Sequence, residues 1–160
     1  MSDHPVIVAI DPGPEQSAWV CYNPYSGGLR AYATVPNEHL RAILHNLAPN
    51  VTHLVIEQVE SFGMPVGRDV FETVYWSGRF AEAVHPLPVE RIGRKAVKLH
   101  LCGSVRAKDP NIRQALIDRY GGSKAEAIGT KASPGPLYGV TGDVWSALAV
   151  AVAWSNRRAA

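Results

Sequence analysis

Residues 6–13 read VIVAIDPG, and the predicted fold is built outward from this segment. Its first five residues are apolar and mostly β-branched, which predicts a central strand buried on both faces. The Asp-Pro-Gly that follows cannot continue a strand, so Asp11 is placed immediately past its end. An acid beside a buried strand is a candidate for chemistry, because an unpaired charge there is costly. Asp before Pro-Gly is also an ordinary turn former, and both interpretations stand at this point.

The flanking sequence predicts one α/β domain over residues 1–160, built on a mixed five-stranded sheet with helices on both faces. Alternating or continuous apolar runs predict strands at Val6–Ile10, Ser17–Tyr22, Leu29–Val35, His53–Ile56 and Leu87–Ile92. Helical spacing predicts helices at Glu38–Asn46 (capped by Asn37), Asp69–Ala83, Asp109–Tyr120 (capped by Asp109) and Gly142–Asn156. Residues 123–141 are rich in Gly, Pro and Lys and predict a long mobile loop.

The composition is that of an ordinary globular domain, with 46% hydrophobic and 19% charged residues. The most apolar run, Val144–Trp154, is too short to cross a membrane, so we expect no membrane association. Cys21 and Cys102 lie far apart in apolar-flanked segments, and we expect both to be reduced and buried, as in a cytoplasmic protein.

Three acids lie where an active site would need them. Asp11 and Glu57 each end an apolar strand, and Asp143 begins the last predicted helix, where it can also serve as a simple N-cap. Strand ends of a mixed sheet can meet at one edge, and a crossing helix can add a third carboxylate. Such a cluster repels itself unless cations fill it, and hard oxygen ligands suit Mg²⁺ or Mn²⁺. Two such ions per site would promote phosphodiester hydrolysis.

Positive charge is concentrated in one part of the chain, although the net charge is only +2. Segment 91–113 contains a single acid, Asp109, and seven basic residues: Arg91, Arg94, Lys95, Lys98, Arg106, Lys108 and Arg113. This excess can follow a phosphate backbone, or it can be a solvated loop and helix face. Lys124 and Lys131 lie in the Gly/Pro-rich segment that leads into Asp143, and the same two interpretations apply to them.

At this point the sequence resembles the RuvC-type Holliday junction resolvases of the ribonuclease H-like superfamily. The resemblance lies in segments 6–13, 55–59 (VIEQV), 94–98 (RKAVK), 103–112 and 143–151, which follow the order of the family's motifs and span nearly the whole chain. It implies a ribonuclease H-like fold, a divalent metal, and cleavage of branched DNA by a homodimer.

The resemblance also assigns roles to residues of this chain. Asp11, Glu57 and Asp143 correspond to catalytic metal ligands, and Lys98 and Lys108 lie near the scissile phosphate, with Lys108 counted as catalytic. Together with the basic and loop segments, this gives an expected DNA-binding set of Lys98, Lys108, Arg94, Lys131 and Phe62.

Two departures from the family pattern matter. The last motif usually has a second acid three residues after the first, and Ser146 occupies that position here, so a fourth acid would have to come from elsewhere, with Glu60 the nearest candidate. The family also places an aromatic residue at the position of Glu60; Phe62 or Met64 can substitute as an apolar wedge, or can simply pack. These departures and the small size resemble virus- or prophage-encoded versions.

Other functions fit parts of the pattern. A nuclease of the same fold can act on other DNA or RNA structures, and a catalytically degenerate domain can only bind nucleic acid. Sugar kinases and actin-like ATPases also open with Asp-x-Gly after a first strand, but they pair two such domains, which 160 residues cannot supply.

The helix predicted over Asp69–Ala83 has more apolar residues than a single core-facing stripe needs. They are Val70, Phe71, Val74, Tyr75, Trp76 and Phe80. This additional apolar surface predicts a homodimer in which the helix contacts a second copy of the chain. Alternatively, the helix is wedged between the sheet and the last helix, which would bury the same residues within one chain.

Overall fold

The strand predicted around residues 6–10 is the centre of the sheet. The computed structural model describes residues 5–159, and in it β1 (Ile7–Asp11) lies in a five-stranded sheet of order β3-β2-β1-β4-β5. β2 (Gln16–Tyr22) pairs antiparallel with β1, and β3 (Leu29–Pro36) with β2. On the other side, β4 (His53–Gln58) and β5 (Val89–Gly93) continue the sheet in parallel. The predicted mixed five-stranded sheet is confirmed.

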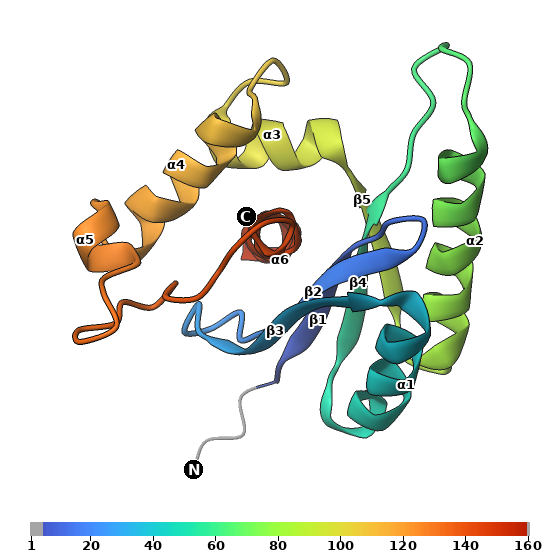
Figure 1. Cartoon of the computed structure of the whole chain (residues 1–160), viewed down its shortest axis with the longest axis horizontal. Coiled ribbons are helices and arrows are strands. Elements are labelled where there is room, and N and C mark those ends of the chain that lie inside the picture. Colours follow the sequence, from blue (N-terminus) through green and yellow to red (C-terminus); the bar gives the residue numbers. More distant parts are fainter. Residues whose placement is uncertain (1–4, 160) are drawn as a thin grey trace.

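Helices cover both faces of this sheet (Figure 1). α1 (Asn37–Leu47), with the short 3-10 helix η1 (Ala48–Asn50) after it, and α2 (Arg68–Ala83) cover one face. α6 (Val144–Ala159) covers the other face, and α3 (Arg94–Cys102), α4 (Asp109–Tyr120) and the four-residue α5 (Lys124–Ala127) extend around α6. None of the helices in the described part of the chain is both long and apolar enough to span a membrane.

The alternation of side chains along β1 divides the core into two clusters. Ile7 and Ala9 pack in the cluster that contains α6, whereas Val8 and Ile10 pack in the cluster that contains residues of α1 and α2. From Ala147 to Ala153, each residue of α6 is fully buried, which explains why this helix is apolar on all sides. β1 is therefore buried on both faces, and its end is a rigid point from which to present a side chain.

Two segments differ from the sequence-based expectation. Residues 94–102 form α3, where no separate helix was predicted, and Gly103 ends it in the left-handed conformation. The segment 123–141 is not a featureless loop, because it contains α5 and buries Ala127, Leu137 and Val140. Backbone hydrogen bonds such as Leu137 N to the Ala127 carbonyl hold it together.

The helix caps and one cysteine also differ. Asn37 is the first residue of α1 and is buried, with Pro36 at the cap position, so Asn37 does not cap the helix. Asp109 is likewise the first residue of α4, after Lys108 at the cap position. Cys21 and Cys102 are both free thiols; Cys21 is buried as predicted, but Cys102 is only half-buried.

Candidate active site

Asp11 and Glu57 lie side by side at one edge of the sheet. The parallel register between β1 and β4 pairs Ile10 with Ile56, so the next residue of each strand is one of the two acids. Both follow residues that are fully or almost fully buried, and both are themselves half-buried. The two apolar strands thus deliver two carboxylates to the same place.

Hydrogen bonds hold the turn after Asp11 in place. The Gly13 amide donates to Ser17 Oγ (3.0 Å), the Ser17 hydroxyl donates to Asn37 Oδ1 (2.7 Å), and Asn37 Nδ2 donates to the Gly13 carbonyl (2.9 Å). We call this closed set of bonds the Gly13–Ser17–Asn37 ring. A side chain at Gly13 would collide with the Gln16 carbonyl, so the tight turn requires glycine. The side chain of Asn37 therefore fixes the segment that follows Asp11.

The surroundings of Asp11 oppose its ionisation. Burial, followed by the negative charges of Glu57 and Asp143, raises the pKa of Asp11 from 3.8 to about 7. The nearby guanidinium of Arg94 lowers this pKa, and the carboxylate of Asp109 raises it. Three acids, from β4, α4 and the residue just before α6, therefore raise the pKa of Asp11.

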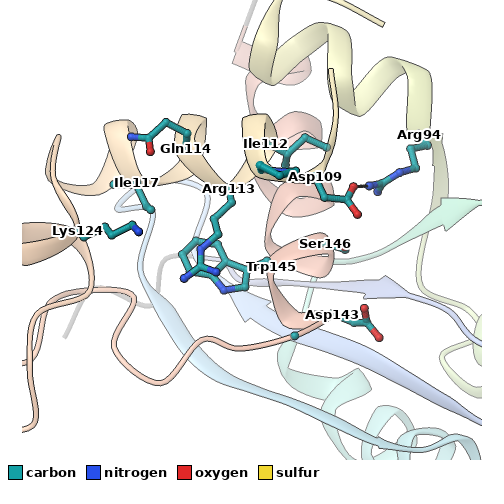
Figure 2. Close-up of a pocket in the computed structure, with 12 residues that line it drawn as sticks. Arg94, Asp109, Ile112, Arg113, Gln114, Ile117, Lys124, Asp143, Trp145 and Ser146 are labelled. Carbon is teal, nitrogen blue, oxygen red and sulfur yellow. Dashed lines mark hydrogen bonds and ion pairs between the residues drawn. The ribbon is translucent and has the colours of Figure 1, made fainter. Parts of the chain in front are cut away.

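Arg94 at the start of α3 is the cation nearest to Glu57. Its Nη1 lies 3.5 Å from Glu57 Oε2, and its Nη2 pairs with Asp109 Oδ1 (Figure 2). Burial raises the pKa of Glu57, and the charge of Arg94 opposes that rise. At 3.5 Å the contact with Glu57 is an ion pair rather than a hydrogen bond, and the buried Oε2 atom has no hydrogen-bond donor among the described residues.

The donor set suits a hard divalent cation. Glu57 Oε2 is buried without a hydrogen bond, and the charge of Asp11 is opposed by its neighbours, so a cation would satisfy both. Within residues 5–159, no three acidic, His or Cys side chains are arranged to hold one metal ion together. The structure thus brings Asp11 and Glu57 together, with the guanidinium of Arg94 beside Glu57, but it does not arrange them with Asp143 as three ligands of one metal position in residues 5–159.

Sequence reasoning missed Asp109 as part of this site. It was treated as a helix cap, whereas its carboxylate pairs with Arg94 and raises the pKa of both Asp11 and Glu57. The signal in the sequence was its position as the single acid in a strongly basic stretch. That it reaches Arg94 depends on how α4 packs on α3, which no local pattern reveals.

The two positions that depart from the family pattern also lie at the site. Glu60 lines a pocket of about 200 Å³ together with Asp11, Glu57, Phe62 and Arg94. We call this pocket the acid pocket. The carboxylate of Glu60 packs against Gly93, at the start of α3. Ser146 lies on α6 and lines a neighbouring cleft together with Asp143.

Some of the predicted DNA-binding residues lie near the acid pocket, and others do not. Phe62 is exposed at the acid pocket, with Lys95 Nζ 4.5 Å from the centre of its ring. Lys98 is close enough to Glu57 for its charge to lower the pKa of that acid. Lys108 and Lys131 are exposed, and neither lines the acid pocket or the cleft beside it.

Solved structures of known proteins share this fold. A Thermus thermophilus RuvC structure superposes with a TM-score of 0.72 at 16% identity, covering 96% of this chain and 95% of that one. RuvC from T. thermophilus in complex with Holliday junction substrate gives a TM-score of 0.72 at 17% identity, covering 97% of this chain and 95% of that one. No protein-family model and no curated protein matches the sequence. The comparison confirms the predicted RuvC-like, ribonuclease H-like fold.

Proposed function

We propose that this chain, which has the RuvC fold, is a divalent-metal-dependent endonuclease that cleaves phosphodiester bonds in branched DNA, as a Holliday junction resolvase does. The observation that carries the proposal is the pairing of Asp11 and Glu57 at adjacent strand ends, with Asp143 acting electrostatically on Asp11 from the start of α6. The solved RuvC with bound Holliday junction has the same fold and supports branched DNA as the substrate.

In this proposal Asp11, Glu57 and Asp143 hold Mg²⁺ or Mn²⁺, with two ions per site. When bound, the ions activate water and stabilise the leaving oxygen. Asp11 must lose its proton to act as a ligand, and its pKa of about 7 places that step near neutral pH. Arg94 and Lys98 act on Glu57 and bring positive charge to the edge where a phosphate would lie.

The test is cleavage of end-labelled substrates: a four-way junction, a three-way junction, a flap, single-stranded DNA and an RNA–DNA hybrid. We expect cleavage of branched DNA with Mg²⁺ or Mn²⁺, none with a chelator, and a loss of at least about a hundredfold in Asp11→Asn and Glu57→Gln. Asp118→Asn, an exposed acid on α4, is the matched control and should cut like wild type. Wild-type rates in Asp11→Asn would show that Asp11 is only a turn residue.

A second candidate, a catalytically degenerate domain that only binds nucleic acid, is favoured by two observations. Ser146 replaces the second acid of the last motif, and no three potential ligands among the described residues are arranged around one metal position. The same assay separates the two functions, because the degenerate domain binds the four-way junction and cuts nothing at any metal concentration.

We also propose that the chain acts as a homodimer through α2. Phe71, Val74 and Tyr75 are 65%, 52% and 60% exposed, whereas Phe80 is buried in the core and Trp76 packs beside it. The helix thus carries an apolar outer face besides its core-facing one. Two copies would supply two sites, as symmetric cutting of a four-way junction requires.

A further inference from the structure

A cleft of about 510 Å³ lies beside the acid pocket, between α4, α5 and the start of α6. We call it the α4–α6 cleft. Figure 2 shows Asp143 near one end and Lys124 at the other, with Arg113 and Trp145 between them. The cleft therefore begins at an acid of the candidate active site and continues along a wall that carries positive charge. The volume is in the range of small-ligand sites, which is about 300–1,000 Å³.

Trp145 holds Arg113 in position at the centre of the cleft. The guanidinium carbon of Arg113 lies 4.8 Å from the centre of the indole ring, while Trp145 itself is only 8% exposed. The buried ring supports one face of an exposed, planar cation. A supported guanidinium loses less freedom on binding, and its free face and N–H groups remain available to a phosphate or a base.

The positive charges of this wall are not neutralised by the protein. Among residues 5–159, neither Arg113 nor Lys124 forms an ion pair, in contrast to Arg94 and Arg158, which pair with acids. The remaining charged groups in the lining are Arg94, Asp109 and Asp143, at the end nearest the acid pocket. Charge thus changes from acidic at the active-site end to purely basic at the Lys124 end.

We propose that the α4–α6 cleft binds the phosphate backbone of the nucleic-acid strand that is cut, with Arg113 and Lys124 contacting the nucleotides next to the scissile phosphate. This inference rests on the proposed nuclease function and adds a substrate subsite to it. Trp145 is a positioning residue, which acts through Arg113. A phosphodiester strand fits both ends of the cleft. At the acidic end, metal ions held by the acids would bind its phosphate, and along the rest of the cleft the side chains of Arg113 and Lys124 would contact the following phosphates or bases.

The test uses Arg113→Ala and its matched control Arg119→Ala, an exposed arginine of the same helix that does not line the cleft. Both are placed in the Asp11→Asn background, so that the labelled four-way DNA junction stays intact. Fluorescence anisotropy over a salt series gives the affinity and its salt dependence. We expect Arg113→Ala to weaken binding roughly tenfold. It should also reduce the slope of log affinity against log salt by about one. Arg119→Ala should change the affinity less than about twofold.

Two further variants separate contact from folding. Lys124→Ala, at an exposed residue, should reproduce the weaker binding and the lower salt slope. Arg113→Lys keeps the charge but loses the planar stack on Trp145, so it should restore the salt slope and recover only part of the affinity. Equal affinities for Arg113→Ala and Arg119→Ala, in a protein whose wild type binds and cuts the junction, would overturn the subsite alone. A wild type that neither binds nor cuts any of the substrates would instead remove the proposed function.

Discussion

Asp11 shows most clearly that the site is built at a cost to stability. The folded chain binds its proton with a pKa of about 7, against 3.8 for an ordinary aspartate. The stability linked to this group is therefore fully present below about pH 4 and is lost as the pH rises through 7. Without metal, the ionised Asp11 destabilises the fold at neutral and alkaline pH.

We therefore predict that Asp11→Asn stabilises the metal-free protein in a pH-dependent way. At pH 8 the variant should be more stable by about 2 kcal/mol, or roughly 5 °C in Tm, and at pH 4 the two proteins should differ little. Thermal unfolding in the presence of a chelator measures both. Adding Mg²⁺ at pH 8 should raise the Tm of wild type but not of the variant; equal Tm values at pH 8 in chelator would contradict the raised pKa.

Arg94 gives a second prediction at the scale of a single residue. Because its guanidinium pairs with both Glu57 and Asp109, it neutralises charge that a metal ion would otherwise neutralise. Arg94→Ala should lower the Tm of the metal-free protein at pH 8 and increase the rise in Tm produced by Mn²⁺ by several degrees. Arg91→Ala, an exposed arginine of β5, is the control and should leave both values unchanged. The same Mn²⁺ response in wild type and Arg94→Ala would show that the guanidinium does not compete with the metal.

At the scale of elements, the Gly13–Ser17–Asn37 ring ties the end of β1 to β2 and α1. Asn37→Ala removes one donor and one acceptor of a buried set and should destabilise the protein by about 2 kcal/mol. Because the turn after Asp11 loses its support, the Mn²⁺-induced rise in Tm should also shrink. Asn46→Ala, an exposed asparagine of the same helix, should do neither. Stability lost without any change in the metal response would limit the ring to a structural role.

The strands and helices show which parts of the fold could be predicted from the sequence and which could not. The spacing of apolar residues predicted the five strands and four of the long helices. It could do so because an element that buries one or both faces needs apolar residues at regular intervals along the sequence. It missed α3, in which Val97 is the one buried hydrophobic residue and the partly buried Ala96, Leu101 and Cys102 alternate with basic residues. The role of Asn37 could not be predicted, since it depends on Gly13, which lies 24 residues away.

The candidate site divides in the same way. Asp11 and Glu57 could be identified because each interrupts an apolar run, and the strand pairing then places them together. Asp109 and the stacking of Arg113 on Trp145 arise from the packing of α4 on α3 and α6, between segments more than ten residues apart. Contacts of that kind leave no local pattern in a single sequence.

At the scale of the whole molecule, the apolar outer face of α2 predicts self-association. Light scattering at micromolar concentration should give the mass of a dimer, and the double variant Phe71→Asp/Val74→Asp should give that of a monomer. Both residues are more than half exposed, so the substitutions should leave the Tm of the monomer nearly unchanged. Glu82→Lys, at an exposed charged residue of α2, is the control. A monomeric wild type would contradict the dimer.

The order of the acids along the chain determines when the candidate site can first be assembled. Asp143 immediately precedes α6, the helix that covers the Ile7 and Ala9 face of the sheet. A ribosome that has released β1 and β4 has therefore made two of the acids, but neither the third acid nor the helix that covers this face. The candidate site therefore comes together only when the last helix of the sheet-and-helix core packs into place.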